Sequence, residues 1–187
     1  MPNKPRVAII YGFAEGSWHG RRLRKSLRQN GFAISHNPKS ADIIIAHSAG
    51  CYLIPHDTQA KLTLHAGYTY WPNRKLLHSL QDNLRLERKE HGFSKWLVRC
   101  AINDIYMLNV LQTVRMVRGW RDPGSFLDGL PAGRHIFVRP QYDSYCEPNQ
   151  LMLRTNQRNT YISIAAGNHN NIWDNPTEYV NLLQSLT

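Results

Sequence analysis

Residues 42–50 read Asp-Ile-Ile-Ile-Ala-His-Ser-Ala-Gly and carry the strongest structural signal in the chain. The first half of this stretch is continuously apolar, which is typical of a strand buried on both faces of a parallel sheet. The small residues Ala46 and Gly50 then allow a tight turn from that strand into a helix, with Ser48 at the turn. This pattern is the nucleophile elbow G-x-S-x-G with Ala at the first Gly position. It predicts a reactive serine at the carboxyl end of a buried strand, although serine is also a favoured helix N-cap.

Short apolar runs on both sides of this stretch predict further strands. They lie at residues 7–11, 32–35, 60–67, 135–138 and 160–165. Apolar residues spaced three and four apart predict amphipathic helices between the strands. They lie at 18–30, 74–90, 93–118 and 177–186, with a short helix near 51–54 and Asn175 as the N-cap of the last. The alternation indicates an α/β protein, a three-layer sandwich with a mostly parallel central sheet.

The alternation breaks in the middle of the chain. Residues 68–133 are mostly helical, so we expect a helical cap inserted into a single domain of residues 1–187. The connection from the strand at 32–35 to the strand at 42–46 spans only six residues. A parallel crossover that contains a full helix needs a dozen or more. Either a bare loop makes this crossing or the strand at 32–35 is misplaced.

The composition excludes several classes of protein. Hydrophobic residues make up 42% of the 187 residues and aromatic residues 10%, which is too much for a disordered chain. No run of 18 apolar residues occurs, and the polar N-terminus lacks the apolar region of a signal peptide. The three cysteines, Cys51, Cys100 and Cys146, stand at long spacings that match neither a zinc site nor a disulfide framework. We therefore expect a reduced, cytoplasmic compartment.

Positive charge is concentrated in two segments. The chain has 23 Lys and Arg against 13 Asp and Glu, a net charge of +10. Residues 1–39 carry eight bases and one acid, and residues 74–121 carry ten bases and four acids. Faces that bind polyanions show this asymmetry, and so do solvated helix faces. Because no nucleic-acid-binding motif accompanies the charge, we expect no nucleic-acid partner, whereas contact with an anionic membrane surface stays open.

Two later strands end close to residues that could activate a serine. A serine hydroxyl needs a base, and the base needs an orienting carboxylate, for attack at neutral pH. The strand at 135–138 leads to Asp143, and the strand at 160–165 leads through Gly167 to His169. The order Ser48, Asp143, His169 along the chain is the order of the α/β-hydrolase triad.

The chain resembles a small member of the α/β-hydrolase superfamily. The resemblance rests on residues 7–12, similar to an early strand, on residues 43–50, similar to the elbow, and on residues 143–148 and 167–169, similar to the acid and histidine loops. It implies a reduced α/β-hydrolase fold. It also implies site roles for five residues. They are Ser48 as nucleophile, His169 as base, Asp143 as orienting acid, and the backbone amides of Phe13 and Ala49 as the oxyanion hole.

The sequence departs from the family pattern in three ways. Ala46 replaces the first Gly of the elbow, the loop at residues 12–16 lacks the His-Gly-Gly run of many esterases, and no helix precedes the elbow strand. Other residues compete for the triad roles. They are Asp128 and Asp174 for the acid, and His65 and His135 for the base, but none has the position that the family uses. A Cys51 nucleophile would need a base of its own, so a buried thiol is the favoured interpretation, and Cys146 lies near the proposed acid.

The substrate pocket is predicted from residues near the proposed triad. They are Gly12, His47, Tyr68, Tyr70 and Trp71, of which the aromatic residues could equally be core packing and His47 could bond locally. The resemblance implies a serine hydrolase that cleaves a carboxylic ester or thioester of a small-molecule acyl substrate, with no metal or organic cofactor. Two alternatives stay open: an acyltransferase with the same triad, and a non-catalytic protein of this fold that binds a polyanion. The sequence does not fix the acyl chain, the leaving group or the oligomeric state.

Overall fold

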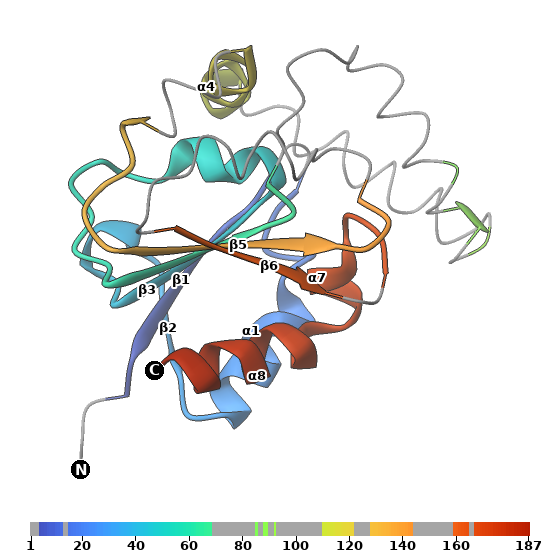
Figure 1. Cartoon of the computed structure of the whole chain (residues 1–187), viewed down its shortest axis with the longest axis horizontal. Helices are drawn as coiled ribbons and strands as arrows, with labels where there is room; N and C mark the ends of the chain where they lie inside the picture. Colours follow the sequence, from blue (N-terminus) through green and yellow to red (C-terminus); the bar gives the residue numbers. More distant parts are fainter. Residues whose placement is uncertain are drawn as a thin grey trace.

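A parallel sheet forms the centre of the computed structural model, which describes residues 4–12, 15–68, 85, 88–89, 92, 110–121, 128–143, 159–164 and 167–187. Within these ranges the sheet has six strands in the order β2-β1-β3-β4-β5-β6 (Figure 1). The strands are β1 (Arg6–Ile10), β2 (Ala33–Ser35), β3 (Ile43–His47), β4 (Leu62–Ala66), β5 (Arg134–Pro140) and β6 (Asn159–Ile164). Each neighbouring pair is parallel. The predicted α/β class with a mostly parallel sheet is confirmed.

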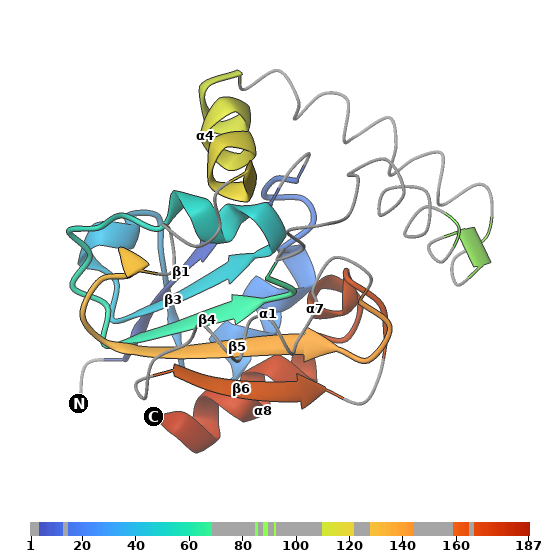
Figure 2. The same ribbon diagram turned by 45° about the horizontal axis from the view of Figure 1, so that its top comes forward.

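Helices cover both faces of the sheet (Figures 1 and 2). One face carries α1 (Arg21–Gln29), α7 (Asn171–Asp174) and α8 (Pro176–Leu186), and the other carries the 3₁₀ helix η2 (Ser48–Leu53) with α4 (Val110–Arg121) packed on it. Because successive side chains of a strand point to opposite faces, Ile43 and Ile45 join the first core while Ile44 and Ala46 join the second. Every residue of β3 is buried, as its apolar run predicts.

A bare loop makes the short crossing between β2 and β3. β2 pairs with one side of β1, and β3 pairs with the other, so the chain passes over β1 between residues 35 and 43. A single turn of 3₁₀ helix, η1 (Pro38–Ser40), fills this crossing, and the side chain of Asn37 accepts a hydrogen bond from the Lys39 amide at 3.0 Å. The strand predicted at 32–35 is therefore correctly placed.

The helices differ in detail from the predictions. The short helix after the elbow begins at Ser48 and is 3₁₀, and the helix predicted to end at 118 continues to Arg121. Asn175 precedes α8, but its side chain makes no capping hydrogen bond. Most of the helix predicted at 74–90 and of the predicted cap lies outside the described residues, as does the first part of the helix predicted at 93–118; residues 85, 88 and 89 are described and helical. None of the helices in the described ranges is both long and apolar enough to cross a lipid bilayer.

Candidate active site

The turn after β3 holds Ser48 in a strained backbone conformation. Its φ angle is +53°, and it is the one non-glycine residue with positive φ among the described residues. This region costs an L-residue about 1 to 2 kcal/mol, so surrounding contacts must hold the turn in place. Two glycines make these close contacts possible. A Cβ on Gly50 would overlap the carbonyl of Tyr11, and a Cβ on Gly12 would lie 2.9 Å from the Ser48 Cβ. The end of β1 can therefore approach the elbow only because both positions lack side chains.

Asp143 and His169 form a buried hydrogen-bonded pair at the same edge of the sheet. Asp143 follows β5 and His169 follows β6, and the Asp143 Oδ2 lies 3.0 Å from the His169 Nδ1. The two residues are only 2% and 6% exposed. Their loops are joined by a 3.2 Å hydrogen bond from the Tyr142 amide to the Gly167 carbonyl. When the Nδ1–H of a neutral His169 donates a hydrogen bond to Asp143, Nε2 is left with the lone pair that a general base needs.

Gly67, at the end of β4, lies against this pair. Its φ is +59°, and a Cβ added there would lie 3.1 Å from the His169 Nδ1 and 3.3 Å from the Asp143 Oδ2. A side chain at this position would press on both partners. The sequence predicts Gly67 only as the end of the strand at 60–67. A glycine at such a position can mark a site where another group approaches the backbone closely.

A second buried pair, Glu15 with His47, lies directly beside the first. The Glu15 Oε2 lies 2.9 Å from the His47 Nδ1, and the His47 Nε2 lies 2.8 Å from the backbone carbonyl oxygen of His169. The rings of His47 and His169 are 4.8 Å apart between centroids. Since His47 directly precedes Ser48, this arrangement brings the elbow, the loop after β1 and the histidine loop into one region.

The loop after β1 is organised by the carboxylate of Glu15. The amide of Gly12 donates to Oε2 at 2.7 Å, and the indole Nε1 of Trp173 donates to Oε1 at 2.9 Å. Trp173 lies on α7, stacks on Tyr11 at 5.6 Å and meets the ring of His47 edge-on at 5.0 Å. Neither Glu15 nor Trp173 is predicted as a functional residue from the sequence, because nothing near either residue in the sequence indicates the partner.

The groups around Glu15 and His47 shift the pKa of each residue towards its charged form. Burial by itself raises the pKa of Glu15, but the charge and hydrogen bond of His47, the charge of His19 and the indole of Trp173 lower that pKa to about 2. Burial by itself lowers the pKa of His47, but the Glu15 carboxylate, the His169 carbonyl and the charge of Asp143 raise it above 6.5. A carboxylate and an imidazolium are therefore the favoured forms.

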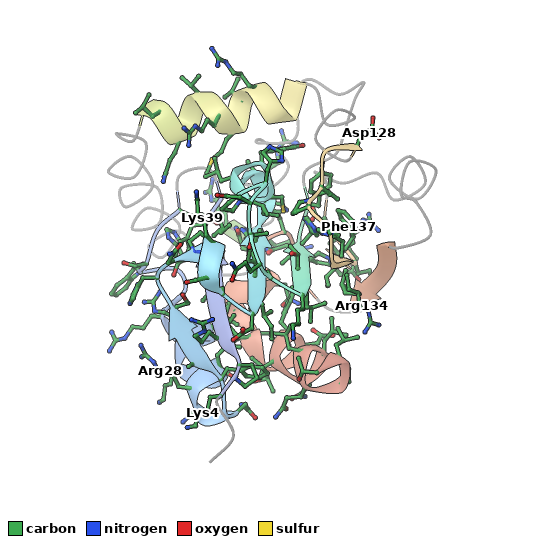
Figure 3. The ribbon with its side chains drawn as sticks, turned by 90° about the vertical axis from the view of Figure 1, so that its left-hand side faces the viewer. Lys4, Arg28, Lys39, Asp128, Arg134 and Phe137 are labelled. Atoms are coloured by element: carbon green, nitrogen blue, oxygen red, sulfur yellow. The ribbon has the colours of Figure 1, made fainter. Side chains whose placement is uncertain are left out.

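The competing histidines and acids lie elsewhere. His65 and His135 are buried on the opposite face of the sheet, where the His65 Nε2 lies 3.0 Å from the His135 Nδ1 and the His65 ring stacks on Phe137 at 4.2 Å. Burial, together with the charge of His135, lowers the pKa of His65 well below 6.5. Asp128 is exposed (Figure 3), and Asp174 lies on α7.

The remaining predicted residues are partly described. Ala49 is buried and follows Ser48, whereas Tyr68 is 1% exposed and packs against Phe137 and Tyr52. Cys51 is a buried thiol whose Sγ donates to the Ala46 carbonyl at 3.5 Å. The others lie outside the described residues: Phe13, Tyr70, Trp71, Cys100 and Cys146. No group of three or more His, Cys, Asp or Glu that could hold a metal occurs in the part of the chain that the structure describes.

Solved structures share this arrangement of strands and helices over nearly the whole chain. An enol-lactonase from Burkholderia xenovorans LB400 matches with a TM-score of 0.64 at 10% identity, over 98% of this chain and 91% of the other. A thioesterase domain from the curacin biosynthetic pathway matches with 0.62 at 13% identity, over 98% and 92%. A hydrolase from Oleispira antarctica matches with 0.66 at 12% identity, over 98% and 91%.

The chain has the α/β-hydrolase fold. The matches span 91–92% of the length of these hydrolases. No protein-family model matches the sequence, and no curated protein matches it. At 10–13% identity the likeness concerns the fold, and the activity has to be argued from the side chains.

Proposed function

We propose that the protein is a serine hydrolase that cleaves a carboxylic ester or thioester through an acyl-enzyme on Ser48. The observation that carries this proposal is the buried Asp143–His169 hydrogen bond of 3.0 Å, at the sheet edge where Ser48 sits in its strained turn. Strain at a single residue, held by glycines on both sides, is typical of a functional position in a packed domain. A strained serine and a carboxylate-oriented imidazole at the same sheet edge are two parts that nucleophilic acyl transfer needs.

The proposed reaction has two halves. The Nε2 of His169 takes the proton of Ser48 as its Oγ bonds to the carbonyl carbon, and the carbonyl electron pair becomes an oxyanion held by the amides of Ala49 and Phe13. Collapse of this intermediate breaks the bond to the alcohol or thiol, which takes the proton from His169. Water then attacks the acyl-enzyme with His169 again as base, which releases the acid and restores Ser48.

The substrate class is supported by the structurally similar proteins. They include an enol-lactonase, a thioesterase domain, carboxylesterases and a methylesterase. All of these names describe cleavage at an activated acyl carbon. An ester or thioester is therefore the substrate class that we propose for this chain.

Labelling with a fluorophosphonate followed by intact-mass measurement tests the nucleophile. We expect one adduct on the wild-type protein and none on Ser48→Ala, with labelling retained in Ser185→Ala, an exposed serine on α8. A panel of esters and thioesters, analysed for acyl products, then separates a hydrolase from an acyltransferase. Absence of any adduct on folded wild-type protein across several pH values would overturn the proposal and favour a non-catalytic polyanion-binding role.

A further inference from the structure

Glu15 is placed where its neighbours favour a carboxylate. Three donors converge on its two oxygens: the Gly12 amide at 2.7 Å and the His47 Nδ1 at 2.9 Å on Oε2, and the Trp173 Nε1 at 2.9 Å on Oε1. An amide would point a hydrogen at one of these donors, and a protonated acid could satisfy His47 only by donating to its Nδ1. Because the Gly12 amide and the Trp173 indole also donate to Glu15, the hydrogen-bond pattern favours an ionised Glu15, in a site that is almost closed to solvent.

His47 is placed between two acceptors. Its Nδ1 faces the Glu15 carboxylate, and its Nε2 faces the His169 carbonyl oxygen at 2.8 Å. A neutral imidazole has one N–H and one lone pair, so it can satisfy only one of these contacts, and its lone pair would face oxygen lone pairs at the other. With Glu15 ionised, both contacts are satisfied only when both ring nitrogens carry protons.

We propose that His47 is a buried imidazolium at neutral pH and that the Glu15–His47 pair positions both the His169 loop and the Gly12 loop for the reaction of Ser48. His47 contacts the backbone of His169, and Glu15 holds the amide of the loop that follows β1, so one ion pair fixes the two loops to each other. This role rests on the proposed hydrolase function. His47 and Glu15 are positioning residues, since each acts on the reaction through another group.

Loss of the His47 proton should release the histidine loop. The carboxylate is the stronger acceptor, so the neutral ring keeps the hydrogen on Nδ1 and turns the lone pair of Nε2 towards the His169 carbonyl. The charged and titratable groups that face this pair come from each neighbouring element: His19 after β1, Asp143 after β5, and His169 after β6. Asp143 and Glu15 both favour the charged ring. The proposal therefore expects activity to fall at alkaline pH as His47 is deprotonated.

The protonation state can be measured without any activity assay. Selective ¹⁵N-histidine labelling of the full chain gives signals for nine histidines, and comparison with His47→Gln identifies the signal of His47. We expect both nitrogens of His47 to be protonated at pH 7, and we expect Glu15→Gln to move its pKa down by about 1 to 3. A neutral His47 at pH 7, or a titration that Glu15→Gln leaves unchanged, overturns the proposal whether or not the protein is a hydrolase.

The pH profile of catalysis tests the positioning role. With p-nitrophenyl acetate as the probe, we expect His47→Gln to lower kcat by about 10- to 100-fold with KM nearly unchanged. We also expect it to remove the alkaline fall in kcat, because a glutamine amide can donate to the His169 carbonyl at any pH. His36→Gln, at an exposed histidine, is the matched control and keeps the wild-type profile. An alkaline fall that persists in His47→Gln would contradict the proposal.

The two proposals fail in different ways. If Ser48 is not a nucleophile, wild-type protein gives no fluorophosphonate adduct, while the nitrogen signals of His47 still report its charge. If the Glu15–His47 pair does not position the loops, the fluorophosphonate labels the wild-type protein and labels His47→Gln at the same rate across the pH range. Should Glu15→Gln fail to fold, Trp173→Phe removes one hydrogen bond to the same carboxylate and moves the pKa of His47 in the same measurement.

Discussion

The buried Glu15–His47 pair and the buried His65–His135 pair differ in charge because different acceptors lie beside their imidazole rings. In the pair beside the elbow, His47 lies between a carboxylate and a carbonyl, and its pKa is raised. In the pair on the other face, His135 donates from Nε2 to the Pro131 carbonyl and accepts from His65 through Nδ1, which needs one proton on each ring. Burial lowers the pKa of both of these histidines. Depth of burial is similar in the two pairs, so the acceptor beside each ring decides its charge.

Removal of the carboxylate should have the largest effect on stability. Glu15→Gln removes the charged partner of the buried His47 ring and points an amide hydrogen at a donor, so we expect the free energy of unfolding to fall by about 3 to 5 kcal/mol. Urea unfolding at pH 7 measures this loss. Glu178→Gln, a half-buried glutamate in the first turn of α8, should change stability by no more than about 0.5 kcal/mol. Equal losses in the two variants would mean that Glu15 is an ordinary polar residue.

An added methyl group at Gly67 should disturb the neighbouring Asp143–His169 pair. Gly67→Ala adds about 1 to 2 kcal/mol of backbone strain at positive φ and places a Cβ 3.1 Å from the His169 Nδ1. We expect kcat for an activated ester to fall by about 10- to 100-fold. Gly31→Ala is the matched control, because Gly31 has φ +88° with nothing within 4 Å of an added Cβ. It should lose similar stability and keep its activity, and a similar loss of activity in both variants would contradict the prediction.

Loss of the hydrogen bond in the neutral His65–His135 pair should cost less stability than loss of the Glu15 carboxylate. His65→Phe keeps an aromatic ring against Phe137 but removes the donor to His135, whose Nδ1 is then unsatisfied. We expect the free energy of unfolding to fall by about 1 to 2 kcal/mol, less than in Glu15→Gln. Urea unfolding of both variants under the same conditions makes the comparison. A larger loss in His65→Phe would show that the neutral pair is the more important of the two.

The two pairs should also respond to pH in opposite directions. The raised pKa of His47 gives stability that is fully present below its unfolded value of 6.5 and is lost as the pH rises through the folded pKa. The lowered pKa values of His65 and His135 give stability that is present above 6.5 and is lost as the pH falls below it. Each proton that the folded and unfolded states bind differently changes the free energy of unfolding by at most about 1.4 kcal/mol per pH unit. As the pH is lowered from 6.5 to 5, the urea midpoint should therefore fall less steeply in His65→Phe than in the wild type.

The sequence predicted the sheet and three site residues for physical reasons. Continuous apolar runs such as residues 43–46 are typical of strands covered on both faces of a parallel sheet, and the carboxyl ends of such strands meet at one edge. Ser48, Asp143 and His169 could therefore be placed together from their positions after strands. The structure brings Asp143 to His169 at hydrogen-bond distance.

Glu15, Gly67 and Trp173 could not be found in the same way. Glu15 is 32 residues from His47 and 158 residues from Trp173, and its role depends on where three separate elements meet. Gly67 matters because of space around two side chains that lie far along the chain. His47 was weighed as a pocket residue or a local hydrogen-bonding residue, and the structure shows it bonded at both nitrogens inside the protein. A sequence pattern shows which residues follow a strand but not which acceptors surround a ring.

The hydrogen bond between Glu15 and Trp173 has a consequence for synthesis on the ribosome. A growing chain exposes Glu15 long before α7 exists, and until then the carboxylate keeps its water. The desolvated ion pair can form only after residues 169–173 have left the exit tunnel and packed against β1 and β3. Nascent chains that lack this part have neither the Trp173 indole nor the His169 carbonyl that surround the pair in the folded protein. The order in which the polypeptide is made thus delays assembly of the charged pair until after the strands that surround it have been synthesised.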